Sequence, residues 1–163
     1  MEIRYARQSD TEGINVIGNH YIQESPANFK ADPLNLAERE QWMAGFHETG
    51  RYRLLIAVDN EKVCGYACSA IFHERSAYET SVSTSIYLHP ETCSRGLGTQ
   101  LYTRLFEVLK GEDIKRAFAG ITLPNPASVA IHKKFGFTEV GVFTKAGRKF
   151  GKYWDVLWLE KAM

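Results

Sequence analysis

Apolar residues recur along the chain at two spacings, one typical of helices and the other of strands. Residues three and four apart share a face in three segments, which predicts helices from Ser9 to about Ser25, from Leu36 to Glu48 and from Leu97 to about Leu109. The first has a capping-box pattern at Ser9 and Glu12, and a fourth helix is predicted to start at Asn125-Pro126. Alternating or β-rich runs predict strands at residues 3–7, 53–59, 62–72, 81–89, 116–122, 138–147 and 150–160.

These elements follow one another as a strand, two helices, three strands, a helix, a strand, a helix and two strands. Strands interleaved with helices in this way are typical of an α/β architecture, a mixed sheet with helices packed on its faces. No repeat, low-complexity segment or linker divides the sequence. The pattern therefore predicts a single domain over residues 1–163.

The connection between the strand near Leu88 and the helix at Leu97 contains the run Arg95-Gly96-Leu97-Gly98. Backbone N–H groups at the start of a helix lie at the positive end of its dipole, and glycine lets a ligand approach them closely. The run is therefore a candidate phosphate site, with Arg95 available for a charge-assisted contact. It is also a common strand-to-helix turn, and it is neither a dinucleotide fingerprint nor a Walker loop.

Composition and charge narrow the choice of partners. The 163 residues include 20 basic and 19 acidic side chains, interspersed, for a net charge of +1. Such a chain has no basic stripe for nucleic acid or for a membrane, and we expect neither partner. Three cysteines without zinc-type spacing and an N-terminus without a secretory signal predict a cytoplasmic protein. Cys64 and Cys68 are expected to share one face of a strand as small buried side chains.

Two segments, "SIYLHPETCSRGLG" and "AGITLPNPASVAIHKKFGF", resemble the acyl-CoA-binding core of the GNAT family of N-acetyltransferases. The closing "GRKFGKYWDV" and the early "NHYIQESPANFKADP" are similar to the branch that acetylates phosphinothricin and methionine derivatives. The resemblance covers nearly the whole chain. It implies the GNAT fold, a central mixed, mostly antiparallel twisted sheet of about seven strands flanked by about four helices. It also implies acetyl-CoA as co-substrate, no metal, and a homodimer.

The resemblance further implies where acetyl-CoA binds. In the family, the strand after Ser83 splays from the strand that carries residues 119–122, and the pantetheine arm pairs with backbone in the gap. Cys93 stands where the family usually has Gln or Arg, which removes one side-chain candidate for the phosphate and leaves the backbone amides. The implied cofactor residues are Ile86, Tyr87 and Leu88 on the strand, Ser94, Arg95, Gly96, Leu97, Gly98 and Thr99 at the diphosphate, and Asn125, Ser128 and His132 near the pantetheine.

Three residues are candidates for moving protons. His132 occupies the place of a tyrosine that protonates the leaving thiolate in many relatives; alternatively, it is a partly buried histidine hydrogen-bonded to CoA or to backbone. Ser83 stands where the branch usually carries the carboxylate that deprotonates the substrate amine, and serine is a poor base. Glu79 has the same parity as Ser83 and is the candidate for a relocated carboxylate, with a solvated surface glutamate as the alternative.

The stretch "FHERSAYE", residues 72–79, aligns with the segment that grips the substrate carboxylate in relatives. Arg75 and Tyr78 remain, whereas His73 and Glu79 replace two arginines. One guanidinium is enough to bind a carboxylate, but the smaller positive charge favours a less acidic amine or amino-acid derivative over phosphinothricin. The implied substrate residues are Phe29, His73, Arg75, Tyr78, Ser83 and Lys149.

Together these features predict an enzyme, an N-acetyltransferase that moves acetyl from acetyl-CoA directly to the primary amine of an amino acid or similar small molecule in a ternary complex. Two alternatives stay open. One is a protein or peptide N-terminal acetyltransferase. The other is a CoA-binding sensor module that lost its base at Ser83, which the intact "NPASVAIHKKFGF" segment disfavours.

Overall fold

The computed structural model describes residues 1–92 and 96–163. The strands are β1 (Glu2–Tyr5), β2 (Arg53–Asp59), β3 (Lys62–Ile71), β4 (Ser81–Leu88), β5 (Arg116–Thr122), β6 (Thr138–Lys149) and β7 (Lys152–Ala162). The helices are α1 (Thr11–Glu24), α2 (Leu36–Met43), α3 (Leu97–Leu109) and α4 (Pro126–Lys134), with short 3-10 turns at Gln8–Asp10 and Ser76–Tyr78. The predicted order of strands and helices is confirmed.

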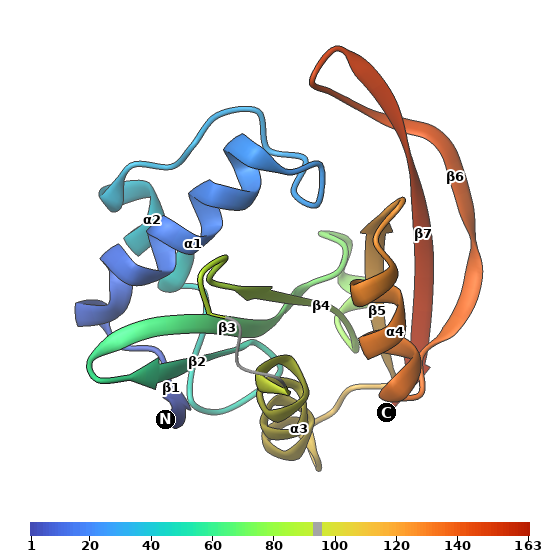
Figure 1. Ribbon diagram of the computed structural model, residues 1–163. Helices are drawn as coiled ribbons and strands as arrows, with labels where there is room; N and C mark the ends of the chain where they lie inside the picture. The colour runs from blue at the N-terminus through green and yellow to red at the C-terminus, as the bar shows by residue number, and fades with distance from the viewer. Residues whose placement is uncertain (93–95) are drawn as a thin grey trace.

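The seven strands form one sheet in the order β1-β2-β3-β4-β5-β7-β6. Neighbouring strands run antiparallel except β4 and β5, which run parallel. The sheet is therefore mixed and mostly antiparallel, as expected. Figure 1 shows β6 and β7 as a long hairpin that extends beyond the rest of the sheet.

Helices cover both faces of the β2–β4 part of the sheet (Figure 1). α3 packs on β2, β3 and β4, and α1 packs on the opposite face of β3, with α2 beside it. The apolar stripe predicted for α3 points into the core, since its leucines at 97, 101, 105 and 109 are at most 1% exposed. Within the described residues, no helix is long and apolar enough to cross a membrane.

Cys64 and Cys68 are both buried, as predicted, but they do not share a face of β3. Cys64 packs in the cluster beneath α3, whereas Cys68 packs in the cluster beneath α1. The reason is a β-bulge. Val58 pairs with Val63 while Ala57 pairs with Gly65, so that Cys64 is an extra residue that reverses the alternation of side chains.

Two predicted helix boundaries are wrong. α2 ends at Met43 rather than Glu48, because the N–H groups of Gly45 and Phe46 donate to carbonyls only three residues back and the His47 N–H donates to the Tyr52 carbonyl at 2.9 Å. The capping box at Ser9 does not form. Asp10 is the N-cap of α1, and its carboxylate accepts hydrogen bonds from the Arg4 guanidinium and the Arg7 N–H instead.

Candidate active site

β4 and β5 separate within the sheet, as expected after Ser83. They pair only where Ser81–Ser83 face Arg116–Phe118. Beyond this point, the facing edges of residues 84–88 and 119–122 have no strand partner in the described part of the sheet. A cavity of about 520 Å³ lies in this gap, bounded by α4 and the start of α3. Its volume is within the range of small-molecule sites.

The walls of the gap offer backbone to a ligand. Unpaired strand edges carry free N–H and C=O groups that pair with an extended chain. Ala119 and Gly120 on β5 have little or no side chain, so the edge is accessible from the cavity. The predicted cofactor residues Ile86, Tyr87 and Leu88 line the opposite wall on β4.

The start of α3 lies at one end of the cavity. Gly96 is the N-cap with a φ of 92°, a left-handed conformation that glycine adopts without strain. The N–H groups of the first helical turn have no partner within the helix, and Gly96, Gly98 and Thr99 line the cavity. The positive end of the α3 dipole therefore opens on the gap. Leu97 is buried in the core instead, and Ser94 and Arg95 lie outside the described residues.

α4 forms the roof of the cavity. Its predicted N-cap is confirmed, because the Asn125 side chain accepts a 3.1 Å hydrogen bond from the Ser128 N–H. The small side chains of Ala127 and Ala130 leave room below the helix. At the far end, the Lys134 ammonium donates to the Thr99 hydroxyl at 3.3 Å, which places a cation beside the N-terminus of α3. An anionic group bound at the start of α3 would contact both the Lys134 ammonium and the N–H groups of the first helical turn.

His132 lines the cavity from α4 but is only 3% exposed. Its Nδ1 lies 2.7 Å from the Ser128 carbonyl oxygen, and its Nε2 lies 2.8 Å from the Tyr102 hydroxyl. A carbonyl only accepts, so Nδ1 carries the proton and Nε2 accepts the Tyr102 O–H. Burial lowers the pKa of His132, and the bond to Ser128 only partly offsets this effect. The imidazole is neutral and fully engaged, which favours the buried-histidine alternative over an acid for the thiolate.

This arrangement predicts a pH-dependent stability. Below an ordinary histidine pKa of 6.5, the unfolded chain binds a proton that buried His132 resists, so the free energy of unfolding falls as pH drops toward 5 and is unaffected above about 7. For a single proton, the slope of this loss is at most about 1.4 kcal/mol per pH unit. In His132→Gln, whose amide oxygen still accepts from Tyr102, this part of the slope disappears. Denaturant unfolding of both proteins from pH 5 to 8 measures the difference, and parallel curves would contradict the assignment.

The described residues that line the cavity include no carboxylate. Burial raises the pKa of Tyr87 to about 12, partly offset by a hydrogen bond with the Asn28 side chain. Burial also raises the pKa of Tyr21, whose hydroxyl donates to the Leu88 carbonyl at 2.9 Å. Both phenols keep their protons near neutral pH and are unsuited to act as a base. An acceptor amine that enters this part of the cavity must arrive neutral or lose its proton to water.

Ser83 and Glu79 lie at the narrow end of the gap, outside the cavity lining. Ser83 faces Phe118 in the last residue pair between β4 and β5. Glu79 is exposed at the end of the 3-10 turn, where its N–H donates to the Ser76 carbonyl at 3.0 Å. The structure therefore gives Glu79 the position of a solvated side chain.

The segment at residues 72–79 is anchored beside Ser83 by aromatic contacts. The Phe72 ring stacks on Phe118 at 4.2 Å and lies 5.9 Å from the Tyr78 ring. The His73 ring lies 4.7 Å from that of Tyr78, and its Nδ1 accepts a hydrogen bond from the Arg75 N–H. The exposed side chains of His73, Arg75 and Tyr78 are thus held together at this end of the gap.

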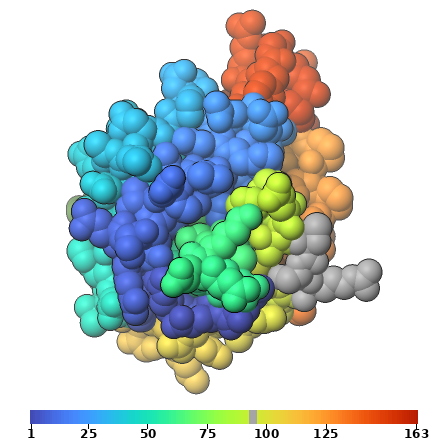
Figure 2. Space-filling model, turned by 60° about the vertical axis from the view of Figure 1, so that its left-hand side comes forward, coloured from blue at the N-terminus to red at the C-terminus, as the bar shows by residue number. Residues whose placement is uncertain are grey.

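Phe29 and Lys149 belong to a contact between the α1–α2 connection and the β6–β7 hairpin. The Phe29 ring packs directly on Gly147, where any Cβ would overlap it. The Lys149 ammonium donates to the carbonyl oxygens of Tyr21, Ser25 and Asn28 at 3.5, 2.9 and 2.5 Å. In Figure 2, the hairpin tip, in red, stands above this blue segment. Neither predicted substrate residue lines the cavity, although neighbouring Tyr21 and Ala27 do.

Sequence reasoning missed several residues of the site. Tyr102, the partner of His132, looks like any other member of the apolar stripe of α3, and only the packing of α4 on α3 makes it a hydrogen-bond donor. A usable signal existed for α4, where small residues follow the Asn-Pro start at the spacing of one helix face. The strand of residues 119–122 was expected at the gap and lines it, whereas the missed lining residues are Tyr21, Ala27, Thr84, Ser85, Ala127, Ala130, Ile131 and Lys134.

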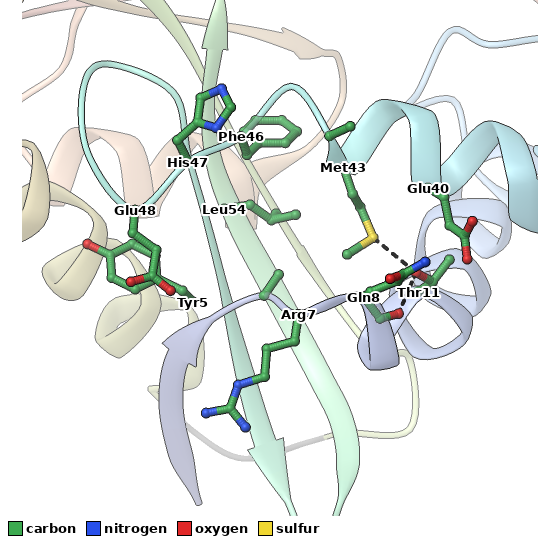
Figure 3. A pocket seen from close by; sticks show the side chains of 12 residues that line it. Tyr5, Arg7, Gln8, Thr11, Glu40, Met43, Phe46, His47, Glu48 and Leu54 are labelled. Atoms are coloured by element: carbon green, nitrogen blue, oxygen red, sulfur yellow. Dashed lines mark hydrogen bonds between the residues drawn. The ribbon is translucent and has the colours of Figure 1, made fainter.

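A second cavity, of about 300 Å³, lies between β1, α2 and the segment that follows α2 (Figure 3). Met43, Phe46 and Leu54 make its apolar walls, and the Thr11 hydroxyl donates to the Gln8 carbonyl at 2.7 Å. It shares no residue with the first cavity and contains none of the predicted site residues.

Comparison with known proteins gives consistent matches. The chain matches the acetyltransferase (GNAT) domain family over residues 3–158. It is 41% identical to phosphinothricin N-acetyltransferase of Streptomyces coelicolor, an alignment that covers 100% of this chain and 96% of that protein. A ribosomal-protein-alanine N-acetyltransferase from Brucella melitensis superposes with a TM-score of 0.93 at 28% identity, covering 100% of both chains. A phosphinothricin acetyltransferase from Sinorhizobium meliloti in complex with AcCoA superposes with a TM-score of 0.90 at 27% identity, covering 99% of this chain and 88% of that one.

Proposed function

The chain belongs to the acetyltransferase (GNAT) domain family, and on this basis we propose that it transfers the acetyl group of acetyl-CoA to the primary amine of an amino acid or similar small molecule. The observation that carries the proposal is the cavity between the unpaired halves of β4 and β5, with the start of α3 at one end. A similar protein is named phosphinothricin N-acetyltransferase, and a similar solved structure contains AcCoA.

The residues of the gap fit acetyl-CoA. The free edges of Ile86–Leu88 and Ala119–Thr122 suit the amide groups of the pantetheine arm, which pairs as an extra strand would. The first turn of α3, with Gly96, Gly98 and Thr99, offers N–H groups to the diphosphate, and the Lys134 ammonium adds a positive charge. Asn125 and Ser128 hold the start of α4 over the arm.

The reaction follows from this placement. The lone pair of the neutral acceptor amine attacks the acetyl carbonyl carbon, the C–N bond forms and the C–S bond breaks. A backbone N–H on the free edge of β4 donates to the carbonyl oxygen, where negative charge develops. Water carries the amine proton toward the departing sulfur, because the described lining offers no carboxylate and both nitrogens of His132 are already bonded within the protein.

The acceptor side favours a small molecule. A peptide substrate needs an open groove, whereas Lys149 and Phe29 fasten the α1–α2 connection to the β6–β7 hairpin at this side. Arg75 is exposed near the narrow end of the gap and is the group we assign to an acceptor carboxylate. Peptide N-terminal acetylation is the second candidate, because a similar structure is named a ribosomal-protein-alanine N-acetyltransferase.

We also propose that the protein is a cytoplasmic homodimer. β6 is an edge strand of the sheet, and apolar side chains on the hairpin are exposed: Val140 by 59%, Phe143 by 59% and Tyr153 by 61%. A monomer would leave this apolar edge in water, where it invites association. Sedimentation should give a species of twice the 18.5 kDa chain mass, and a single species of chain mass would contradict the dimer.

Two-substrate kinetics test the proposed reaction. Direct transfer requires both substrates to be bound at once, so initial rates at varied acetyl-CoA and acceptor should give intersecting double-reciprocal lines. Parallel lines, together with an acetylated enzyme detected by mass spectrometry in the absence of amine, would instead indicate a covalent intermediate.

A further inference from the structure

Lys149 closes the end of a helix that lies far from it in the sequence. α1 ends at Glu24, and Ser25 has an extended backbone, so the last carbonyls of the helix have no glycine cap behind them. The Lys149 ammonium donates to the Tyr21 carbonyl of this last turn and to the carbonyls of Ser25 and Asn28 just beyond it. Three carbonyls match the three donors of an ammonium group.

The hairpin side of this contact is itself held in place. The Trp154 Nε1–H on β7 donates to the Lys149 carbonyl at 2.9 Å. The turn that follows has positive φ values at Phe150 and Gly151, 53° and 74°, which reverse the chain immediately after Lys149. Two residues before Lys149, the Phe29 ring packs directly on Gly147. The ammonium is therefore presented to α1 from a fixed backbone position.

The segment that Lys149 holds forms part of the candidate active site. Tyr21 and Ala27 line the cavity, and the Tyr21 hydroxyl donates to the Leu88 carbonyl on the wall assigned to the cofactor. The Tyr21 ring also lies 4.9 Å from the Tyr87 ring on the same strand. A displacement of residues 21–29 would thus move the acceptor side of the cavity.

We propose that Lys149 is a positioning residue, which holds residues 21–29 against the β6–β7 hairpin and so fixes the acceptor wall of the cavity without touching the acceptor. The expected change in the acceptor KM rests on the proposed function, whereas the expected change in hydrogen exchange at residues 21–29 does not. It replaces the expectation that Lys149 binds the substrate, because three backbone carbonyls already take up the donors of its ammonium group.

Three variants at the hairpin tip test the proposal. Lys149→Met removes the donors and keeps the apolar stem, whereas Lys149→Arg keeps a cation with several donors. Lys152→Met is the matched control, since it removes the same charge at the same tip, from an exposed residue whose ammonium lies over the Trp154 ring at 3.9 Å. For each protein, KM and kcat are measured for acetyl-CoA and for matched acceptors with and without a carboxylate, and hydrogen exchange is followed at the amides of residues 21–29.

In Lys149→Met we expect faster exchange at residues 21–29 and a rise of roughly tenfold in the acceptor KM, equal for both kinds of acceptor, with a smaller rise in the acetyl-CoA KM because the Tyr21 hydroxyl also contacts Leu88 on the cofactor wall. Lys149→Arg should recover most of both properties, and Lys152→Met should match the wild type. A penalty confined to acceptors that carry a carboxylate would overturn the proposal, because it would show direct binding of the substrate. Unchanged exchange in Lys149→Met would also overturn it. If the wild type acetylates no acceptor, the proposed function fails, while the exchange comparison still decides whether Lys149 holds this segment.

Discussion

Gly98→Val is expected to raise the KM for acetyl-CoA by roughly 10- to 100-fold, the loss that corresponds to one or two charge-assisted hydrogen bonds. Gly98 lies in the first turn of α3 and lines the cavity. A Cβ at this position would already lie 3.0 Å from Ile131 on α4 and 3.5 Å from Ile86 on β4. The two further methyl groups of valine would push α4 from its place and cover the N–H groups assigned to the diphosphate.

Two controls separate this effect from unfolding. Gly98→Ala adds only the Cβ, which the terminal methyl of Ile131 can accommodate, and should raise the KM much less. Gly45→Val places valine at an exposed turn remote from the cavity and should leave the KM unchanged. Titration of acetyl-CoA by calorimetry alongside the kinetics measures the affinity directly. Wild-type affinity in a folded Gly98→Val protein would refute the assignment of the diphosphate to the start of α3.

Arg75→Gln is expected to raise the KM of carboxylate-bearing acceptors by about tenfold or more, and to leave acetyl-CoA unaffected. Arg75 forms no ion pair with any described residue, so its guanidinium is available for bidentate binding of a carboxylate. The aromatic contacts of Phe72 and Tyr78 hold its segment beside Ser83, at the narrow end of the gap.

The acceptor panel for this variant should include each amino acid paired with its amide, which lacks the carboxylate. The KM ratio of acid to amide isolates the contact of Arg75. Arg104→Gln, which removes an exposed arginine on α3, serves as the charge control. If the acid and its amide lose affinity equally in Arg75→Gln, Arg75 shapes the segment and does not bind the carboxylate.

Elements with strong local signals were predicted accurately from the sequence. α3 and β5 have the predicted bounds. In α3 the leucines at helical spacing, and in β5 the short β-rich run, favour the same structure that tertiary packing favours. Asn125 and Pro126 were sufficient to place the start of α4, since capping depends on neighbouring residues alone. α2 ends earlier than predicted because the His47 N–H pairs with the Tyr52 carbonyl, just before the next strand, instead of continuing the helix, and no helical pattern reveals that bond.

The parts of the site that could not be predicted depend on contacts between distant segments. The neutral state of His132 follows from the Tyr102 hydroxyl, which reaches it only when α3 and α4 pack together. The residues next to Lys149 in the sequence suggest an ordinary surface cation. Its three carbonyl partners lie more than a hundred residues earlier in the chain, so only the folded structure identifies them. The bulge at Cys64, which separates it from the face of Cys68, likewise depends on the register of β2.

The proposed acetyl transfer is tested most directly by acetyl-CoA turnover, followed by thiol release and product mass, across amino acids, methionine sulfone and sulfoximine, phosphinothricin, polyamines and short peptides. We expect turnover of one class of small amino-acid-like amines, with one N-acetyl product formed per thiol released. Tight binding of acetyl-CoA without turnover of any amine would contradict it and indicate a CoA-binding sensor, and turnover of peptides alone would replace the small-molecule acceptor with a protein N-terminus.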